Sequence, residues 1–178
     1  MRVEPNVVIR EDVCNQSTRH GTKPCLIVVH STESSNVGHS ATDLRAIVNW
    51  FDNPAAQASS HVVTDADAQS ARCVNDSAKA WTQSFYNPWS LSIEQIGRAS
   101  QSSWPSSQVE ETARWIALWS ERHKIPIRKG LVTKDGRITR TGVVRHSDLG
   151  NLGGGHHDPG AGFPLHECLQ IARRIVNR

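Results

Sequence analysis

The chain has 178 residues, a formal net charge of +3, an apolar fraction of 37% and a charged fraction of 21%. These values predict one globular domain and exclude an intrinsically disordered chain. The charge is too small to indicate a nucleic-acid-binding protein, and no run reaches the ~18 apolar residues that span a bilayer. We expect neither a nucleic-acid nor a membrane partner, and we expect a monomer.

Residues 1–24 are mostly polar and predict an irregular N-terminal segment, followed by one domain over residues 25–178. The first ten residues, Met1–Arg10, lack the apolar core of about 7–15 residues that marks a secretory signal peptide. We therefore expect a protein made in the cytoplasm without a signal peptide. A substrate outside the cytoplasm would then require another exit route.

Apolar patterns predict the elements of the first half of the domain. The β-branched run Leu26–His30 predicts a buried strand. Apolar residues at helical spacing predict a helix from Ser40 to about Phe51. Three further strands are predicted at Ser60–Thr64, Arg72–Asn75 and Leu91–Ile96.

The second half of the domain is predicted to be mainly helix and loop. Ser107 and Glu110 have the spacing of a capping box, which predicts a helix to about His123. Residues 129–160 are rich in glycine and are expected to hold little regular structure, and a closing helix is predicted over Leu165–Val176. The order of these elements predicts an α/β fold with a mixed central β-sheet flanked by helices.

The four cysteines form no C-x-x-C pair, which argues against a structural zinc knot. Cys168 lies on the apolar face of the closing helix and is expected to be a buried thiol. Cys14 and Cys25 could form a disulfide across the turn-rich segment Asn15–Pro24, and the sequence leaves this pairing open.

The placement of the histidines suggests a metal site. His30 ends the first strand, His146 lies in the long loop, and His156, His157 and Asp158 follow a run of glycines. A glycine-rich loop can bend two distant ligands towards a strand end, and two imidazoles with one carboxylate bind zinc and leave one position for a catalytic water. By spacing alone, the same histidines could instead be packed or solvated residues, because no H-E-x-x-H motif is present.

Five motifs, taken together and in this order, resemble the type 2 N-acetylmuramoyl-L-alanine amidases, a superfamily that includes a phage lysozyme and the animal peptidoglycan recognition proteins. The resemblance implies a mixed sheet flanked by helices and one zinc ion per chain. It also implies hydrolysis of the amide bond between N-acetylmuramic acid and L-alanine in peptidoglycan or a muropeptide. The motifs are LIVVHST (Leu26–Thr32), SSHVVTDAD (Ser59–Asp67), LSIEQIG (Leu91–Gly97), RHSDLG (Arg145–Gly150) and HHDPGAGFP (His156–Pro164).

The same resemblance assigns roles to individual residues. The implied zinc ligands are His30, His146 and Asp158. Glu94 stands where relatives carry a catalytic glutamate, a general base that takes a proton from the zinc-activated water and passes it to the leaving amine. His156 stands where relatives often carry a lysine that stabilises the oxyanion, and a histidine there could act as a neutral donor or as a cation.

Substrate-binding residues are predicted with alternatives left open. His61 matches a family position near the cleft, and lining the cleft and packing are both consistent with its sequence. Trp89 and Trp104, with Trp81, lie in loops flanking the Glu94 strand and could stack on sugar rings or anchor those loops. The remaining tryptophans are expected in the core, namely Trp50, Trp115 and Trp119.

Two other functions remain as alternatives at this stage. Some recognition proteins of this superfamily bind peptidoglycan without cutting it, but they typically lack a zinc ligand, whereas all three ligands and Glu94 are present here. A zinc hydrolase of another cell-wall amide is the second alternative. The resemblance and the missing signal peptide favour a phage endolysin, or its catalytic domain, that reaches the wall through holin-made holes. A cytoplasmic recycling amidase is the competing setting.

Overall fold

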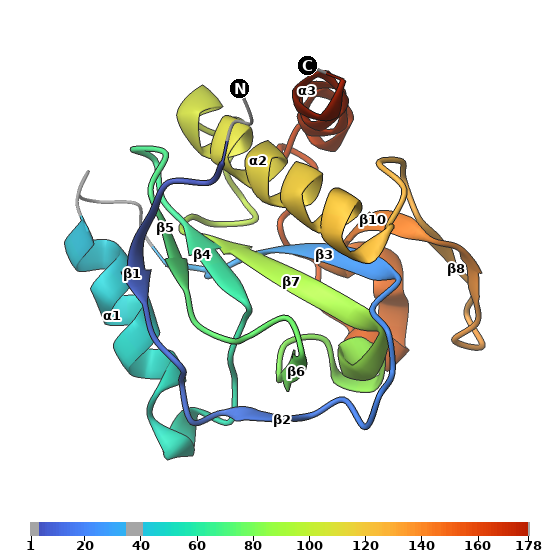
Figure 1. Ribbon diagram of the computed structural model, residues 1–178, viewed down its shortest axis with the longest axis horizontal. Helices are drawn as coiled ribbons and strands as arrows, with labels where there is room; N and C mark the ends of the chain where they lie inside the picture. The colour runs from blue at the N-terminus through green and yellow to red at the C-terminus, as the bar shows by residue number, and fades with distance from the viewer. Residues whose placement is uncertain (1–3, 35–40, 178) are drawn as a thin grey trace.

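A six-stranded sheet with the order β1-β5-β4-β7-β3-β10 forms the centre of the molecule in the computed structural model, which describes residues 4–34 and 41–177 (Figure 1). Only β4 and β5 are antiparallel, and every other neighbouring pair in this sheet is parallel. The predicted α/β fold with a mixed central sheet is therefore confirmed. No helix within the described ranges has both the length and the apolar character required to cross a membrane.

The elements follow one another closely along the chain. The first half contains β1 (Val7–Arg10), β2 (Gln16–Thr18), β3 (Leu26–Ser31), α1 (Ala41–Phe51), η1 (Pro54–Ala56), β4 (Val62–Thr64), β5 (Ser70–Arg72), β6 (Ala78–Ala80), η2 (Ser84–Trp89) and β7 (Ser90–Gln95). The second half contains α2 (Ser106–His123), β8 (Leu131–Val132), β9 (Ile138–Arg140), β10 (Gly142–Arg145), η3 (His146–Gly153) and α3 (Leu165–Val176). The predicted helix to Phe51 is present, and its predicted start, Ser40, lies outside the described residues.

Strand β3 is buried on both faces, as is usual for a parallel strand inside an α/β fold. Ile27 and Val29 belong to the core cluster that includes α2 and α3, whereas Leu26 and Val28 belong to the cluster under η2 and η3. Because side chains alternate along a strand, His30 lies on the same face as Leu26 and Val28. It therefore lies at the carboxyl end of β3, on the face covered by the two 3₁₀ segments.

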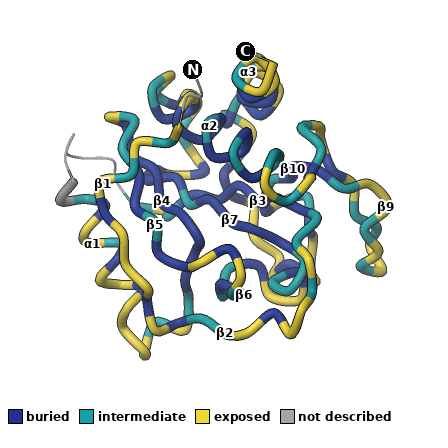
Figure 2. The backbone as a smooth tube through the Cα atoms, viewed as in Figure 1, coloured by how far each residue is buried: buried dark blue, intermediate teal, exposed yellow. Residues whose placement is uncertain are grey.

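Helices cover both faces of the sheet. The inward face of α2 is buried as predicted, through Val109, Ala113, Ile116 and Trp119. Figure 2 shows the central strands β3, β4 and β7 as almost wholly buried, with exposed residues on the outer sides of the helices. The predicted capping box is wrong, because Ser107 lies inside α2 and its hydroxyl donates to the carbonyl of Ala66 instead. The hydroxyl therefore bonds to a distant carbonyl and does not accept from the local backbone N–H that a capping box requires.

The N-terminal segment is not irregular. β1 pairs in parallel with β5 and extends the central sheet, and β2 pairs with β6 in a separate two-stranded sheet. The backbone N–H of Asn6 donates to the buried carboxylate of Glu111 on α2, at 2.7 Å. These strands are only four and three residues long, so their pairing partners stabilise them more than any local pattern does.

Three further expectations differ from the structure. The Gly-rich region 129–160 contains β10, which completes the central sheet beside β3, because Val143 and Val144 bury their side chains on opposite faces. The strand predicted at Arg72–Asn75 ends at Arg72, and the chain then leaves the ladder. All four cysteines are free thiols, so Cys14 and Cys25 form no disulfide, and Cys168 is buried as predicted.

The loop that carries Asp158 is held against a neighbouring loop by close backbone packing. Gly160 has φ +79°, and a Cβ at this position would lie 1.9 Å from the carbonyl oxygen of Ala99. The backbone N–H of Ser147 also donates to the carbonyl of Asp158 at 3.0 Å. Glycine at position 160 is therefore required both by its left-handed conformation and by the lack of space.

We predict that Gly160→Ala destabilises the protein more than Gly21→Ala. Gly21 has nearly the same φ, +80°, but a Cβ there meets nothing within 4 Å, so it isolates the conformational cost of about 1 kcal/mol. The backbone clash at Gly160 should add about 1–3 kcal/mol, measurable by urea unfolding. Equal losses in the two variants would show that the loop relaxes freely around residue 160.

Candidate metal centre and active site

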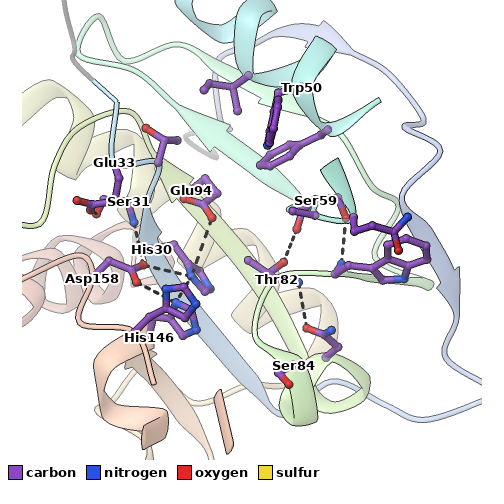
Figure 3. Close-up of a pocket in the computed structure, with 18 residues that line it drawn as sticks. His30, Ser31, Glu33, Trp50, Ser59, Thr82, Ser84, Glu94, His146 and Asp158 are labelled. Atoms are coloured by element: carbon purple, nitrogen blue, oxygen red, sulfur yellow. Dashed lines mark hydrogen bonds and ion pairs between the residues drawn. The ribbon is translucent and has the colours of Figure 1, made fainter. Parts of the chain in front are cut away.

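Three side chains from distant parts of the chain converge at one edge of the sheet. His30 lies at the end of β3, His146 follows β10 directly, and Asp158 comes from the loop before α3 (Figure 3). Because β3 and β10 are parallel neighbours, their carboxyl ends meet, which is where open α/β sheets bind ligands. The three residues are buried, and one potential ligand atom of each lies within 4.8 Å of the others.

The two imidazoles and the carboxylate face one another directly. The Nδ1 atoms of His30 and His146 are 3.0 Å apart. The Nδ1 of His146 lies 2.9 Å from Oδ1 of Asp158, and the Nδ1 of His30 lies 3.4 Å from its Oδ2. The backbone N–H of Ser31 donates to the same Oδ2 at 3.2 Å, which orients the carboxylate towards the histidines.

The partners of the two Nε2 atoms show which nitrogen of each ring carries the proton, and so whether the Nδ1 atom that faces the site is an acceptor. The Nε2 of His146 lies 2.7 Å from the carbonyl oxygen of Gly153, which can only accept, so this nitrogen carries the proton. The Nε2 of His30 lies 3.2 Å from Oε1 of Gln83, so it is also the donor. Burial lowers the pKa of His30 to about 4, so at neutral pH this ring is uncharged and its Nδ1 offers a lone pair.

The donor set fits a zinc ion. With both Nε2 atoms protonated, each Nδ1 presents a lone pair towards the Asp158 carboxyl group. Three buried acceptors with no donor between them are unfavourable unless a cation lies among them, and two histidines with one aspartate match a catalytic zinc site.

Glu94 lies beside this centre. It lies near the end of β7, on the same face of that strand as Ser90 and Ser92, and it pairs in register with His30 on β3. Its Oε1 is 4.0 Å from Nδ1 of His30, and its Oε2 has no hydrogen-bond partner among the described residues. Burial, followed by the negative charges of Asp158 and Glu33, raises the pKa of Glu94 well above its usual value. This carboxylate is therefore unusually basic.

His156 and His157 differ in position. The His156 ring stacks on His146, with ring centroids 4.6 Å apart and an interplanar angle of 16°. It is exposed and lines the cavity beside the metal centre. His157 is also exposed but does not line that cavity. The structure therefore brings together all five residues predicted as ligands or catalytic groups.

The cavity has a volume of about 500 Å³ and extends from the metal centre to an aromatic wall. Trp50 and Trp81 form part of this wall, and Ser59 and Thr82 also line the cavity; Figure 3 shows Trp50, Ser59 and Thr82 on a different side of it from Asp158. The core position predicted for Trp50 is wrong, because its side chain is 55% exposed. Helix α1 buries the side chains of Leu44, Val48 and Phe51, and residue 50 falls on a different face of the helix.

The three residues predicted to bind substrate do not line the cavity. His61 is fully buried, with Arg19 Nη2 2.8 Å from its Nε2 and Ser92 Oγ 2.9 Å from its Nδ1. Burial, followed by the charge of Arg19, lowers the pKa of His61 to about 3. Trp104 is buried against Phe163, with ring centroids 5.8 Å apart.

Trp89 packs on Phe85, with ring centroids 5.2 Å apart, outside the cavity. The packing alternative therefore holds for the buried His61 and Trp104, whereas Trp89 is half-buried and lies outside this cavity. The sequence could not distinguish the faces of the loops that carry the tryptophans. Gln83 was missed altogether, because no sequence pattern marks a buried glutamine as the partner of a histidine.

Comparisons with known proteins identify the family of the chain. The family profile of N-acetylmuramoyl-L-alanine amidase (Amidase_2) matches residues 20–161. N-acetylmuramoyl-L-alanine amidase A of Achromobacter lyticus is 30% identical over 90 residues, which are 49% of this chain and 46% of that protein. The chain thus matches about half the length of this relative.

Solved structures share the fold. AmpD superposes with a TM-score of 0.67 at 18% identity, covering 99% of each chain. The Staphylococcus aureus hydrolase AmiA, solved with its ligand, gives 0.68 at 18% identity over 98% of this chain and 84% of that chain. The endolysin LysCS from Clostridium intestinale gives 0.65 at 16% identity over 94% and 95%. With most of its length matched by the family profile, the chain belongs to the type 2 N-acetylmuramoyl-L-alanine amidase family.

Proposed function

We propose that this protein is a zinc amidase that hydrolyses the bond between N-acetylmuramic acid and L-alanine in peptidoglycan. The observation that carries the proposal is that two imidazoles and one carboxylate, all buried, face one another at the floor of an open cavity. Membership of the amidase family supplies the substrate class.

Zinc held by His30, His146 and Asp158 would act as a Lewis acid on the amide carbonyl and lower the pKa of a coordinated water. Glu94 is placed to accept the proton that the attacking water loses, because its raised pKa makes it a stronger base than an exposed glutamate. The same carboxyl group then returns the proton to the leaving amine of the alanine. Its Oε1, which lies 4.0 Å from Nδ1 of His30, is the oxygen proposed for this transfer.

His156 is proposed to stabilise negative charge on the carbonyl oxygen. Its ring lies on the cavity side of His146 and is exposed, so that a nitrogen can donate to a bound substrate. Trp50 and Trp81 on the opposite wall replace Trp89 and Trp104 as the proposed sugar-stacking residues. A cavity with a polar floor and an aromatic wall suits a substrate that joins a sugar to a peptide.

The arrangement favours catalysis over simple binding, because all three proposed zinc ligands are present and Glu94 lies beside them. Hydrolysis of another cell-wall amide would require a different product, which the first experiment below distinguishes. The phage endolysin setting stays a prediction, because AmpD and the endolysin structures share this fold alike. The monomeric state and holin-dependent release also stay predictions.

We expect the purified protein to bind one zinc ion per chain and to release new N-terminal alanine amines from peptidoglycan without new reducing sugar ends. Zinc is measured by elemental analysis, and products by mass spectrometry of defined muropeptides and of intact sacculi. His30→Ala and Asp158→Ala should lose the zinc, whereas His157→Ala is the matched control that keeps it. Release of reducing ends, or no zinc after reconstitution, would overturn the proposal.

Glu94→Gln should keep stoichiometric zinc and lower kcat by about 10²- to 10⁴-fold, because the amide cannot accept the proton. Zinc content and kcat are measured on the same preparation. Glu110→Gln, on the exposed side of α2, is the control for a change of charge alone. Undiminished turnover in Glu94→Gln would remove this residue from the mechanism.

Trp50→Ala should raise KM for glycan-containing substrates and leave kcat nearly unchanged, because the side chain is remote from the reacting bond. Its 55% exposure makes a loss of stability small, which thermal unfolding checks. Trp89→Ala is the matched control outside the cavity. A larger KM effect in the control would restore the original sequence-based assignment.

A further inference from the structure

The two metal-binding histidines are oriented by different kinds of partner. His146 donates from Nε2 to the backbone carbonyl of Gly153. This carbonyl oxygen can only accept, so its role does not depend on the orientation of a side chain. His30 donates instead to a side-chain amide, that of Gln83. An amide can rotate and present either its oxygen or its nitrogen, so something must hold Gln83 in the orientation that His30 needs.

Gln83 is well placed to be held. It is fully buried and directly precedes η2. Its backbone N–H donates to Oδ1 of Asn87 at 2.7 Å, which fixes the main chain. Its Nε2 contacts Oγ of Ser90, the first residue of β7, and this Oγ lies 2.6 Å from the carbonyl oxygen of Tyr86.

The direction of these hydrogen bonds follows from the last acceptor. The Tyr86 carbonyl can only accept, so the single proton of the Ser90 hydroxyl points towards it. The Ser90 oxygen is then left as an acceptor for Gln83, and the NH₂ end of the amide must face it. The oxygen end, Oε1, consequently faces His30.

We propose that Ser90 and Gln83 form a hydrogen-bond relay, anchored on the Tyr86 carbonyl, that fixes the tautomer of His30 and thereby sets the affinity for the metal. Because Oε1 of Gln83 can only accept, Nε2 of His30 keeps the proton and Nδ1 presents its lone pair to His146 and Asp158. The inference deepens the proposed function and rests on His30 being a zinc ligand. Gln83 and Ser90 are positioning residues that do not touch the metal or the substrate.

The opposite orientation of the amide shows what the relay prevents. With NH₂ towards His30, Nε2 would have to accept and the proton would move to Nδ1, where it blocks the metal-binding lone pair. The Ser90 hydroxyl would then face two acceptors with one proton, and a buried oxygen would lack a donor. Removing the Ser90 hydroxyl deletes this penalty and frees the amide to turn.

Strand β7 offers a matched control. Ser92 lies two residues after Ser90, on the same face of the strand, and is equally buried. Its hydroxyl contacts His61, Ser60 and Thr82 and does not contact the relay. Ser92→Ala therefore reports the loss of a buried serine hydroxyl without a change in the partner of His30.

The test compares the zinc dissociation constants of Ser90→Ala, Gln83→Met, Gln83→Glu and Ser92→Ala, measured by competition with a chromophoric chelator. Ser90→Ala and Gln83→Met should bind zinc about 10- to 100-fold more weakly, the usual effect of losing a partner of a metal-bound histidine. Gln83→Glu should stay within a few-fold of the parent protein, because a carboxylate also accepts from Nε2. Ser92→Ala should bind zinc as the parent does.

A second readout does not depend on zinc. Nitrogen NMR of the histidine rings in the metal-free protein should show His30 protonated on Nε2, and Ser90→Ala should populate the Nδ1-protonated form. If Ser90→Ala does not fold, the Gln83 pair decides, and equal affinities of Gln83→Met and Gln83→Glu overturn the relay. Parent-like affinity and tautomer in Ser90→Ala would overturn it and leave the proposed function standing. A parent protein that binds no zinc would instead overturn both the proposed function and the relay's role in metal affinity.

Discussion

Parallel pairing of β3 with β7 on one side and with β10 on the other is the constraint on which the site depends. It aligns His30 with Glu94 in register and brings the residue that follows β10, His146, to the same edge. Residues 30, 94 and 146 are far apart in the chain, and no local structure could bring them together. Only Asp158 arrives by another route, on a loop locked by Gly160 and by a hydrogen bond to Ser147.

Burial at this edge affects the groups in different ways. It keeps the ring of His30 uncharged and therefore able to donate a lone pair, and it raises the pKa of Glu94 so that the carboxyl group becomes a stronger base. One low-dielectric environment thus favours an uncharged imidazole at His30 and a basic carboxyl group at Glu94.

Control of the two imidazoles is divided between backbone and side chains. The Gly153 carbonyl orients His146, while Gln83 and Ser90 orient His30 from η2 and the start of β7. The η2 segment therefore connects the inner side of the metal centre to the rim of the cavity, where Trp81 and Thr82 precede it. The metal centre and the aromatic wall are parts of one continuous surface rather than separate features.

The sequence alone predicted the strand that ends in His30 and the buried face of α2 from local apolar patterns, and its motifs singled out His30, His146, Asp158 and Glu94, which the structure brings together. Only the tertiary structure decided the roles of residues whose partners are distant. β1 lies in a mostly polar segment and β10 in a glycine-rich one, so only the strands that pair with them reveal them as strands. Trp50 lies on a helix face that the spacing of the apolar residues already leaves outside the core, whereas the burial of Trp104 depends on loop packing that the sequence pattern does not encode. Gln83 acquires its role only when its amide meets His30, 53 residues earlier in the chain, because hydrogen-bond direction depends on atoms that folding brings together.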